Sequence, residues 1–151
     1  MSRRRIALLL ALGVLGGCAS VRSGVLSPVQ GPLSTQTPKP VYAVTAQGIS
    51  SGYSGQMSVA LPSGENCTGT WASVPQGDAS FKDMAEVWDA VYGKGFFGSD
   101  VWGSDLLARG VLKGGSGTVI NVEMFRPAGR RQSDFRGVAK DNKGNIYKLT
   151  F

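Results

Sequence analysis

Seven short stretches of strand character, separated by turn-forming residues, constrain the fold of this 151-residue chain more than any other feature. Polar and hydrophobic residues alternate along them, as in residues 56–61 (QMSVAL), which is the period of a β-strand with one covered face. Glycine, proline, asparagine and aspartate occupy the connections, for example at 62–65 and 141–144. The predicted strands are residues 41–46, 56–61, 67–74, 106–112, 118–125, 134–140 and 145–151.

The period changes in one segment, residues 78–92 (DASFKDMAEVWDAVY). There Phe81, Met84, Trp88 and Val91 recur at the spacing of one helix face, which predicts an α-helix whose aromatic stripe packs into the core. Many short strands and one helix indicate a mainly β (α+β) domain. We expect a small antiparallel sheet, either a sandwich or a partly closed barrel of about seven strands, with the helix packed against it.

The first 17 residues have the composition of an export signal. Arg3, Arg4 and Arg5 precede an apolar run at residues 6–15 (IALLLALGVL). A membrane-spanning helix needs about 20 apolar residues, so this run is too short to span a bilayer but has the usual length for a signal peptide. We therefore interpret residues 1–17 as a cleaved leader, whose loss lowers the formal net charge from +6 to +3.

The end of this leader, Leu15-Gly16-Gly17-Cys18, resembles the lipobox of bacterial lipoproteins. The resemblance implies cleavage before Cys18, a diacylglycerol thioether on its sulfur, and acylation of the new amino group. Ala19 after the cysteine implies sorting to an outer membrane, facing the periplasm. An ordinary secretory cleavage site is the alternative.

The rest of the chain, from Trp88-Asp89-Ala90-Val91-Tyr92 to the closing VAKDNKGNIYKL segment, is similar to small uncharacterised lipoproteins of the bacterial envelope. That likeness implies no activity.

Residues 18–40 begin with the proposed lipid site, Cys18, and hold four prolines among serine, threonine, glutamine and glycine. Proline-dense segments favour extended conformations over helices and sheets. The composition therefore predicts a lipidated cysteine followed by a tether, with a single β-rich domain at residues 41–151.

Composition argues against most catalytic chemistry. The chain has no histidine, the residue best suited to acid–base catalysis near neutral pH and the commonest metal ligand. Cys67 is the only thiol besides Cys18, lies in a predicted strand without a nearby cation, and is expected to be buried. We expect no enzyme activity, no cofactor, no metal and no nucleic-acid partner.

A weak candidate surface combines loop aromatics with a basic loop. Residues 106–151 hold nine basic and three acidic side chains, which could face anionic lipid headgroups or cell-wall polymers, or form a solvated outer face. The loop aromatics could stack on sugars or fold back onto the sheet. The candidate residues are Phe96, Phe97, Trp102, Arg126, Arg130 and Arg131.

Two functions follow for an anchored envelope protein. The first is a structural or protein-interaction role with another envelope component, and the alternative is binding of cell-wall glycan or peptidoglycan. A concave site with an aromatic floor and convergent polar groups favours ligand binding, whereas a flat apolar patch favours a protein partner.

Overall fold

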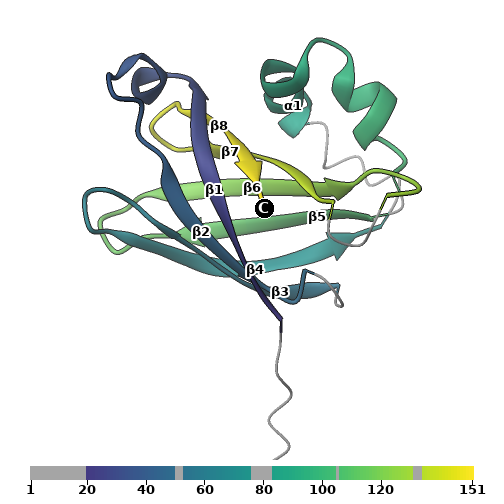
Figure 1. Cartoon of the computed structure of the whole chain (residues 1–151), viewed down its shortest axis with the longest axis horizontal. Coiled ribbons are helices and arrows are strands. Elements are labelled where there is room, and N and C mark those ends of the chain that lie inside the picture. Colours follow the sequence, from purple (N-terminus) through teal and green to yellow (C-terminus); the bar gives the residue numbers. More distant parts are fainter. Residues whose placement is uncertain (1–19, 50–52, 76–82, 105, 131–133) are drawn as a thin grey trace, which may run out of the picture.

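The computed structural model describes residues 20–49, 53–75, 83–104, 106–130 and 134–151, which form a closed antiparallel β-barrel with a short helix on its outside (Figure 1). Each strand pairs with the next along the chain, and the last pairs with the first, so the barrel has no free edge. The strands are β1 (Val21–Gln30), β2 (Tyr42–Gln47), β3 (Ser54–Ala60), β4 (Asn66–Val74), β5 (Leu106–Lys113), β6 (Val119–Arg126), β7 (Arg136–Asp141) and β8 (Ile146–Thr150).

The mainly β fold with one helix is confirmed, and of the two predicted architectures the barrel is correct. The seven predicted strands correspond to β2–β8, with ends that differ by a few residues. The eighth strand, β1, closes the barrel and was not predicted.

β1 shows that the predicted tether is wrong over most of residues 18–40. It pairs with β2 from Val21 opposite Gln47 to Leu26 opposite Tyr42, and with β8 on its other side. The folded domain therefore includes residues 21–30 and does not start at residue 41. Because β1 contributes pairing to both neighbours, it is an integral strand.

The prolines explain why composition misled here. Pro28 lies beside a register shift between β1 and β8, a place where a strand tolerates a residue without an N–H group. The remaining prolines fall in the β1–β2 connection, which contains the 3₁₀ turn η1 (Pro32–Thr35). Proline density thus marks an irregular strand end and a rigid loop.

Alternate residues of the strands fill the barrel with a continuous hydrophobic core. Trp71, Tyr147, Leu112 and Met124 are among its largest members, each fully buried. Cys67 also lies in this core with no exposed surface, which confirms the expected burial. Burial, together with the nearby Glu65 carboxylate, raises the pKa of the Cys67 thiol, whereas a nucleophilic cysteine needs a lowered one.

A second core lies between the outer wall of the barrel and α1 (Ala85–Tyr92), which contacts β7 and β8 (Figure 1). The helix begins later than predicted. Of the predicted stripe, Met84 and Trp88 are buried and Val91 is partly buried, while Phe81 lies outside the described residues. Within the part of the chain that the structure describes, no helix is long and apolar enough to cross a membrane.

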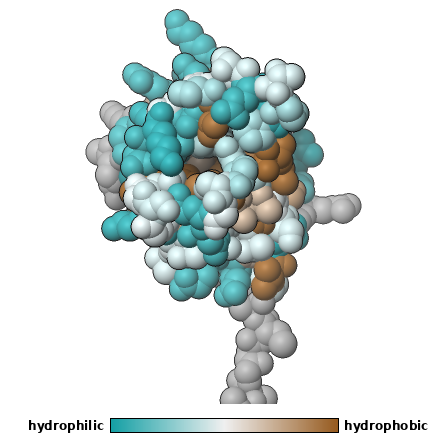
Figure 2. All heavy atoms as spheres, turned by 90° about the vertical axis from the view of Figure 1, so that its left-hand side faces the viewer, coloured by the Kyte–Doolittle hydropathy of each residue, from teal (hydrophilic) through white to brown (hydrophobic). Residues whose placement is uncertain are grey.

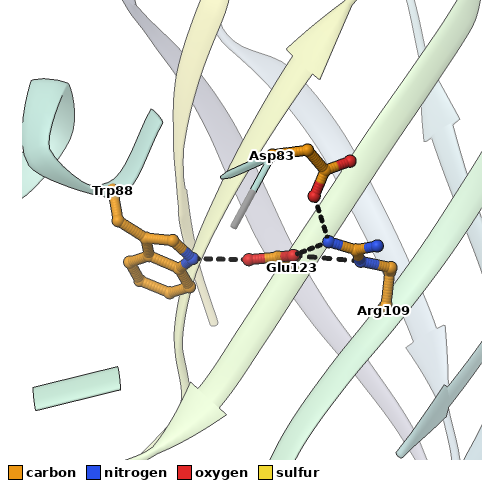
Figure 3. A network of polar contacts seen from close by, with 4 residues as sticks. All are labelled: Asp83, Trp88, Arg109 and Glu123. Atoms are coloured by element: carbon orange, nitrogen blue, oxygen red, sulfur yellow. Dashed lines mark hydrogen bonds and ion pairs between the residues drawn. The ribbon is translucent and has the colours of Figure 1, made fainter. Parts of the chain in front are cut away.

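A polar cluster joins α1 to the barrel wall (Figure 3). Glu123 on β6 is completely buried and accepts a 2.7 Å hydrogen bond from Trp88 Nε1 of α1. Arg109 on β5 donates to the other Glu123 oxygen, with Nε at 3.0 Å, and also pairs with Asp83 at 2.6 Å. Burial raises the pKa of Glu123, and the hydrogen bonds from Trp88 and Arg109 offset part of this rise.

Candidate functional site

A concave site lies at the open end of the barrel where β1 finishes, which we call the mouth. Four connections surround it, β1–β2, β3–β4, β5–β6 and β7–β8, and they enclose a cavity of about 400 Å³. Figure 2 shows this end of the molecule, with hydrophobic atoms inside a hollow and hydrophilic residues around it. The cavity is lined by Pro32, Leu33, Gln36, Pro40, Tyr42, Leu61, Pro62, Ser63, Thr118, Ile120, Asp141, Lys143, Asn145 and Tyr147.

Asp141, at the end of β7, is the buried charge of the mouth. Its Oδ1 accepts hydrogen bonds from the backbone N–H groups of Lys143 at 2.9 Å and Asn145 at 2.8 Å. Its Oδ2 accepts from Asn145 Nδ2 at 2.9 Å and from the Tyr147 hydroxyl at 2.6 Å. Burial alone would raise the pKa of Asp141, but these hydrogen bonds outweigh it and lower the pKa, so the carboxylate stays ionised.

Asn145 connects this carboxylate to the β1–β2 loop. While its Nδ2 donates to Asp141, its Oδ1 accepts a 2.9 Å hydrogen bond from the backbone N–H of Leu33. One buried amide therefore joins the β7–β8 turn to η1 across the barrel end. The contact holds the apolar Leu33 side of the mouth in a fixed position relative to the polar side.

The rim is held by a second set of contacts centred on Thr118. Its hydroxyl donates to Glu65 Oε2 at 2.7 Å, and Lys143 Nζ donates to the Thr118 oxygen at 2.9 Å. Glu65 Oε1 also accepts from the Ser116 N–H at 2.8 Å. The Thr118 hydrogen bond is the main reason that the pKa of Glu65 is lowered. Three of the four connections around the mouth are thus joined by side chains.

Tyr42 has the polar group best placed to meet a ligand. Its side chain is buried, and its ring meets Tyr147 edge-on with centroids 5.8 Å apart. Burial and the nearby Asp141 carboxylate raise the pKa of Tyr42, so its hydroxyl stays protonated. Among the described residues this hydroxyl has no hydrogen-bond partner, and its oxygen is not fully buried, so it faces the accessible space of the cavity. It can therefore donate to, or accept from, a molecule in the cavity.

The arrangement is typical of a ligand site. Leu33, Leu61 and Ile120 give apolar walls, and the two tyrosines stand beside the polar groups. Pockets that bury small ligands combine mostly apolar walls with a few fixed polar groups, and barrel mouths are frequent places for them. The mouth can thus enclose a small molecule and hydrogen-bond one end of it.

Two of the loop aromatics singled out from sequence, Phe96 and Phe97, pack on the barrel, as the competing interpretation proposed. Phe97 is buried in the outer core, and Phe96 stacks on Tyr92 with centroids 4.7 Å apart. Trp102 is 37% exposed and lies 5.8 Å from the Phe97 ring.

The basic residues of that candidate surface are placed differently. Arg126 ends β6 and is partly buried, and Arg130 is exposed in the turn that follows. Cys18 and Arg131 lie outside the described residues.

Sequence reasoning missed the residues of the mouth. The sequence predicts a connection of turn-forming residues at 141–144, and Gly144 does adopt a positive φ of 85° there. An aspartate that opens such a turn often accepts the N–H two residues on, which is the one local signal for Asp141. Nothing local pointed to Tyr42 or Asn145.

No family model matches the sequence, and neither a curated protein nor a solved structure matches it. Interpretation of the mouth therefore depends on its own chemistry.

Proposed function

We propose that the protein is a lipoprotein of the bacterial cell envelope, acylated at Cys18 after loss of residues 1–17, whose barrel mouth binds a small ligand. The ligand has an apolar body and one end that hydrogen-bonds. The anchor is supported by the lipobox-like sequence, and the ligand site by the cavity at the mouth. Its role is binding rather than catalysis.

The single observation that carries the ligand proposal is the unpartnered Tyr42 hydroxyl in an apolar cavity next to an ionised carboxylate. A flat apolar patch would favour a protein partner, but the mouth is concave and has two tyrosines and convergent polar groups. The first of the two functions considered from the sequence is therefore less well supported than a ligand-binding role. The ligand meets the mouth residues rather than the loop aromatics.

Binding is tested with a fluorescent probe of matching chemistry. N-phenylnaphthylamine has an apolar body and one N–H group, and its emission rises when it leaves water. We expect saturable binding to the purified protein. Tyr42→Phe should weaken it by about 1 kcal/mol, or roughly fivefold in Kd, because one neutral hydrogen bond is lost. Tyr53→Phe, at a tyrosine that is 76% exposed, is the matched control and should leave Kd unchanged.

Two outcomes would contradict the ligand proposal. One is no saturable binding. The other is equal weakening by the two tyrosine variants, which would place the probe outside the mouth. The anchor is tested separately, because the intact mass of protein isolated from membranes should show a chain that starts at Cys18 and carries acyl groups. A chain that starts elsewhere, or an unmodified Cys18, would contradict the anchor.

A further inference from the structure

Two cationic side chains converge over an aromatic pair on the outer wall of β7 and β8. The guanidinium carbon of Arg136 lies 6.0 Å from the ring centres of both Tyr92 and Phe96. Lys148 Nζ lies 5.3 Å from the centre of the Tyr92 ring. Cation–π contacts of this kind hold flexible basic side chains in place. The two positive charges are thus positioned together before any ligand arrives.

Arg136, Lys148 and Tyr92 also border a cleft of about 360 Å³, distinct from the mouth. Arg136 lies directly opposite Thr150 in the β7–β8 register, and Lys148 is two residues from Thr150 along β8. The cleft therefore has a guanidinium, an ammonium and a hydroxyl on one side. The partly buried Tyr92 ring gives it apolar surface as well.

Within the part of the chain that the structure describes, no carboxylate lies within ion-pair distance of Arg136 or Lys148. Both side chains are exposed. Positive groups that are fixed in position and unpaired, at a cleft with a hydroxyl, suit a phosphate group, which arginine can bind through two parallel hydrogen bonds.

The position of the cleft indicates where such a phosphate comes from. Thr150 lies opposite Arg136 on one side and opposite Val25 of β1 on the other. Val25 follows Cys18 by seven residues, and seven extended residues span at most about 25 Å. Because β1 is a barrel strand and not a tether, an acylated Cys18 would keep this wall of the barrel close to the bilayer surface.

We propose that this cleft binds the phosphate of an anionic lipid headgroup, with Arg136 and Lys148 as its positive ligands and Thr150 as a hydroxyl donor. Basic pockets beside membranes are known to bind such headgroups. The lipid source depends on the proposed anchor at Cys18, whereas the phosphate chemistry of the cleft does not. Bound in this way, the barrel would have a fixed orientation on the membrane.

Native mass spectrometry of the mature protein in maltoside micelles tests this. With equal amounts of phosphatidylglycerol and phosphatidylcholine, we expect at least fivefold more phosphatidylglycerol adducts. The double variant Arg136→Gln/Lys148→Gln should reduce them to the phosphatidylcholine level. The control Lys39→Gln/Lys113→Gln removes the same charge elsewhere and should retain the preference. Circular dichroism checks that both variants are folded.

Each other outcome has a definite meaning. Equal adducts for the two lipids, or equal loss in the two double variants, would overturn the site. Displacement of phosphatidylglycerol by equimolar inorganic phosphate or glycerol phosphate would overturn the lipid source and indicate a site for free phosphate. The intact mass in the same spectrum reports acylation of Cys18. An acylated protein without lipid preference would contradict the cleft alone, and an unacylated protein with the preference would contradict the anchor alone.

Discussion

The buried Glu123 gives the sharpest stability prediction, because its charge is compensated by one cation. Arg109→Met keeps most of the side-chain volume but leaves a completely buried carboxylate with only the Trp88 hydrogen bond. Removing one partner of a buried ion pair costs about 3–5 kcal/mol. Asp83 is 68% exposed in its side chain, so Asp83→Asn should cost less than about 1 kcal/mol although it pairs with the same arginine.

The assay is urea unfolding followed by tryptophan fluorescence. Burial already places the pKa of folded Glu123 above its unfolded value, and losing Arg109 raises it further. A carboxyl with a raised folded pKa stabilises the fold below its unfolded pKa, and that stabilisation is lost as the pH rises through the folded value. The Arg109→Met penalty should therefore be larger at pH 8 than at pH 5. In Arg109→Met/Glu123→Met, which leaves no buried charge between α1 and the barrel wall, most of the stability should return.

Two results would refute this reasoning. A penalty below about 1 kcal/mol for Arg109→Met would mean that Glu123 is not held in a low-dielectric site. If Arg109→Met cost no more than Asp83→Asn, the exposed contact of Arg109 with Asp83 would account for the whole loss, and the buried contact with Glu123 would contribute nothing.

Two further predictions concern the closure of the barrel and the mouth. A chain truncated to residues 41–151 lacks β1 and should not fold cooperatively, because β2 and β8 lose their shared partner. A normal thermal unfolding transition of this chain, measured by circular dichroism, would contradict the prediction and show that residues 21–30 are dispensable. Asp141 has a lowered folded pKa despite its burial, so its stabilisation is complete above the unfolded pKa, about 4, and is lost as the pH falls through the folded value. Asp141→Asn should therefore lower the stability at pH 7 and flatten its decline between pH 5 and 2, measured by urea unfolding, whereas an unchanged decline would contradict the proposed ionisation.

The strands of the barrel were predictable where alternation was regular. In β3, Met57 and Val59 are buried and Gln56 and Ala60 are exposed, which matches the alternation seen in QMSVAL. In β1 the burial alternates as far as Pro28, but the hydrophobic residues do not follow it, because Val21, Val25 and Val29 are exposed, and so composition suggested a tether. Recognising β1 would have required knowing that β8 needs a partner, which is a property of the closed barrel.

The candidate site was not predictable because it is assembled from distant turns. Leu33, Leu61, Thr118 and Asn145 come from four separate connections, and the distance from Leu33 to Asn145 is 112 residues along the chain. Glu123 gives a related case: alternation places it on the outer face of β6, where a charge is ordinary, but α1 covers it. Only the packing of elements on one another reveals both features.

The most direct test of the ligand-binding proposal is a heteronuclear NMR titration of the native protein with N-phenylnaphthylamine. We predict saturable shifts at Leu33, Tyr42, Thr118, Asn145 and Tyr147, which surround the mouth, and no comparable shifts on the outer wall of the barrel. Shifts confined to the outer wall, or none at saturating probe, would contradict a ligand site in the mouth.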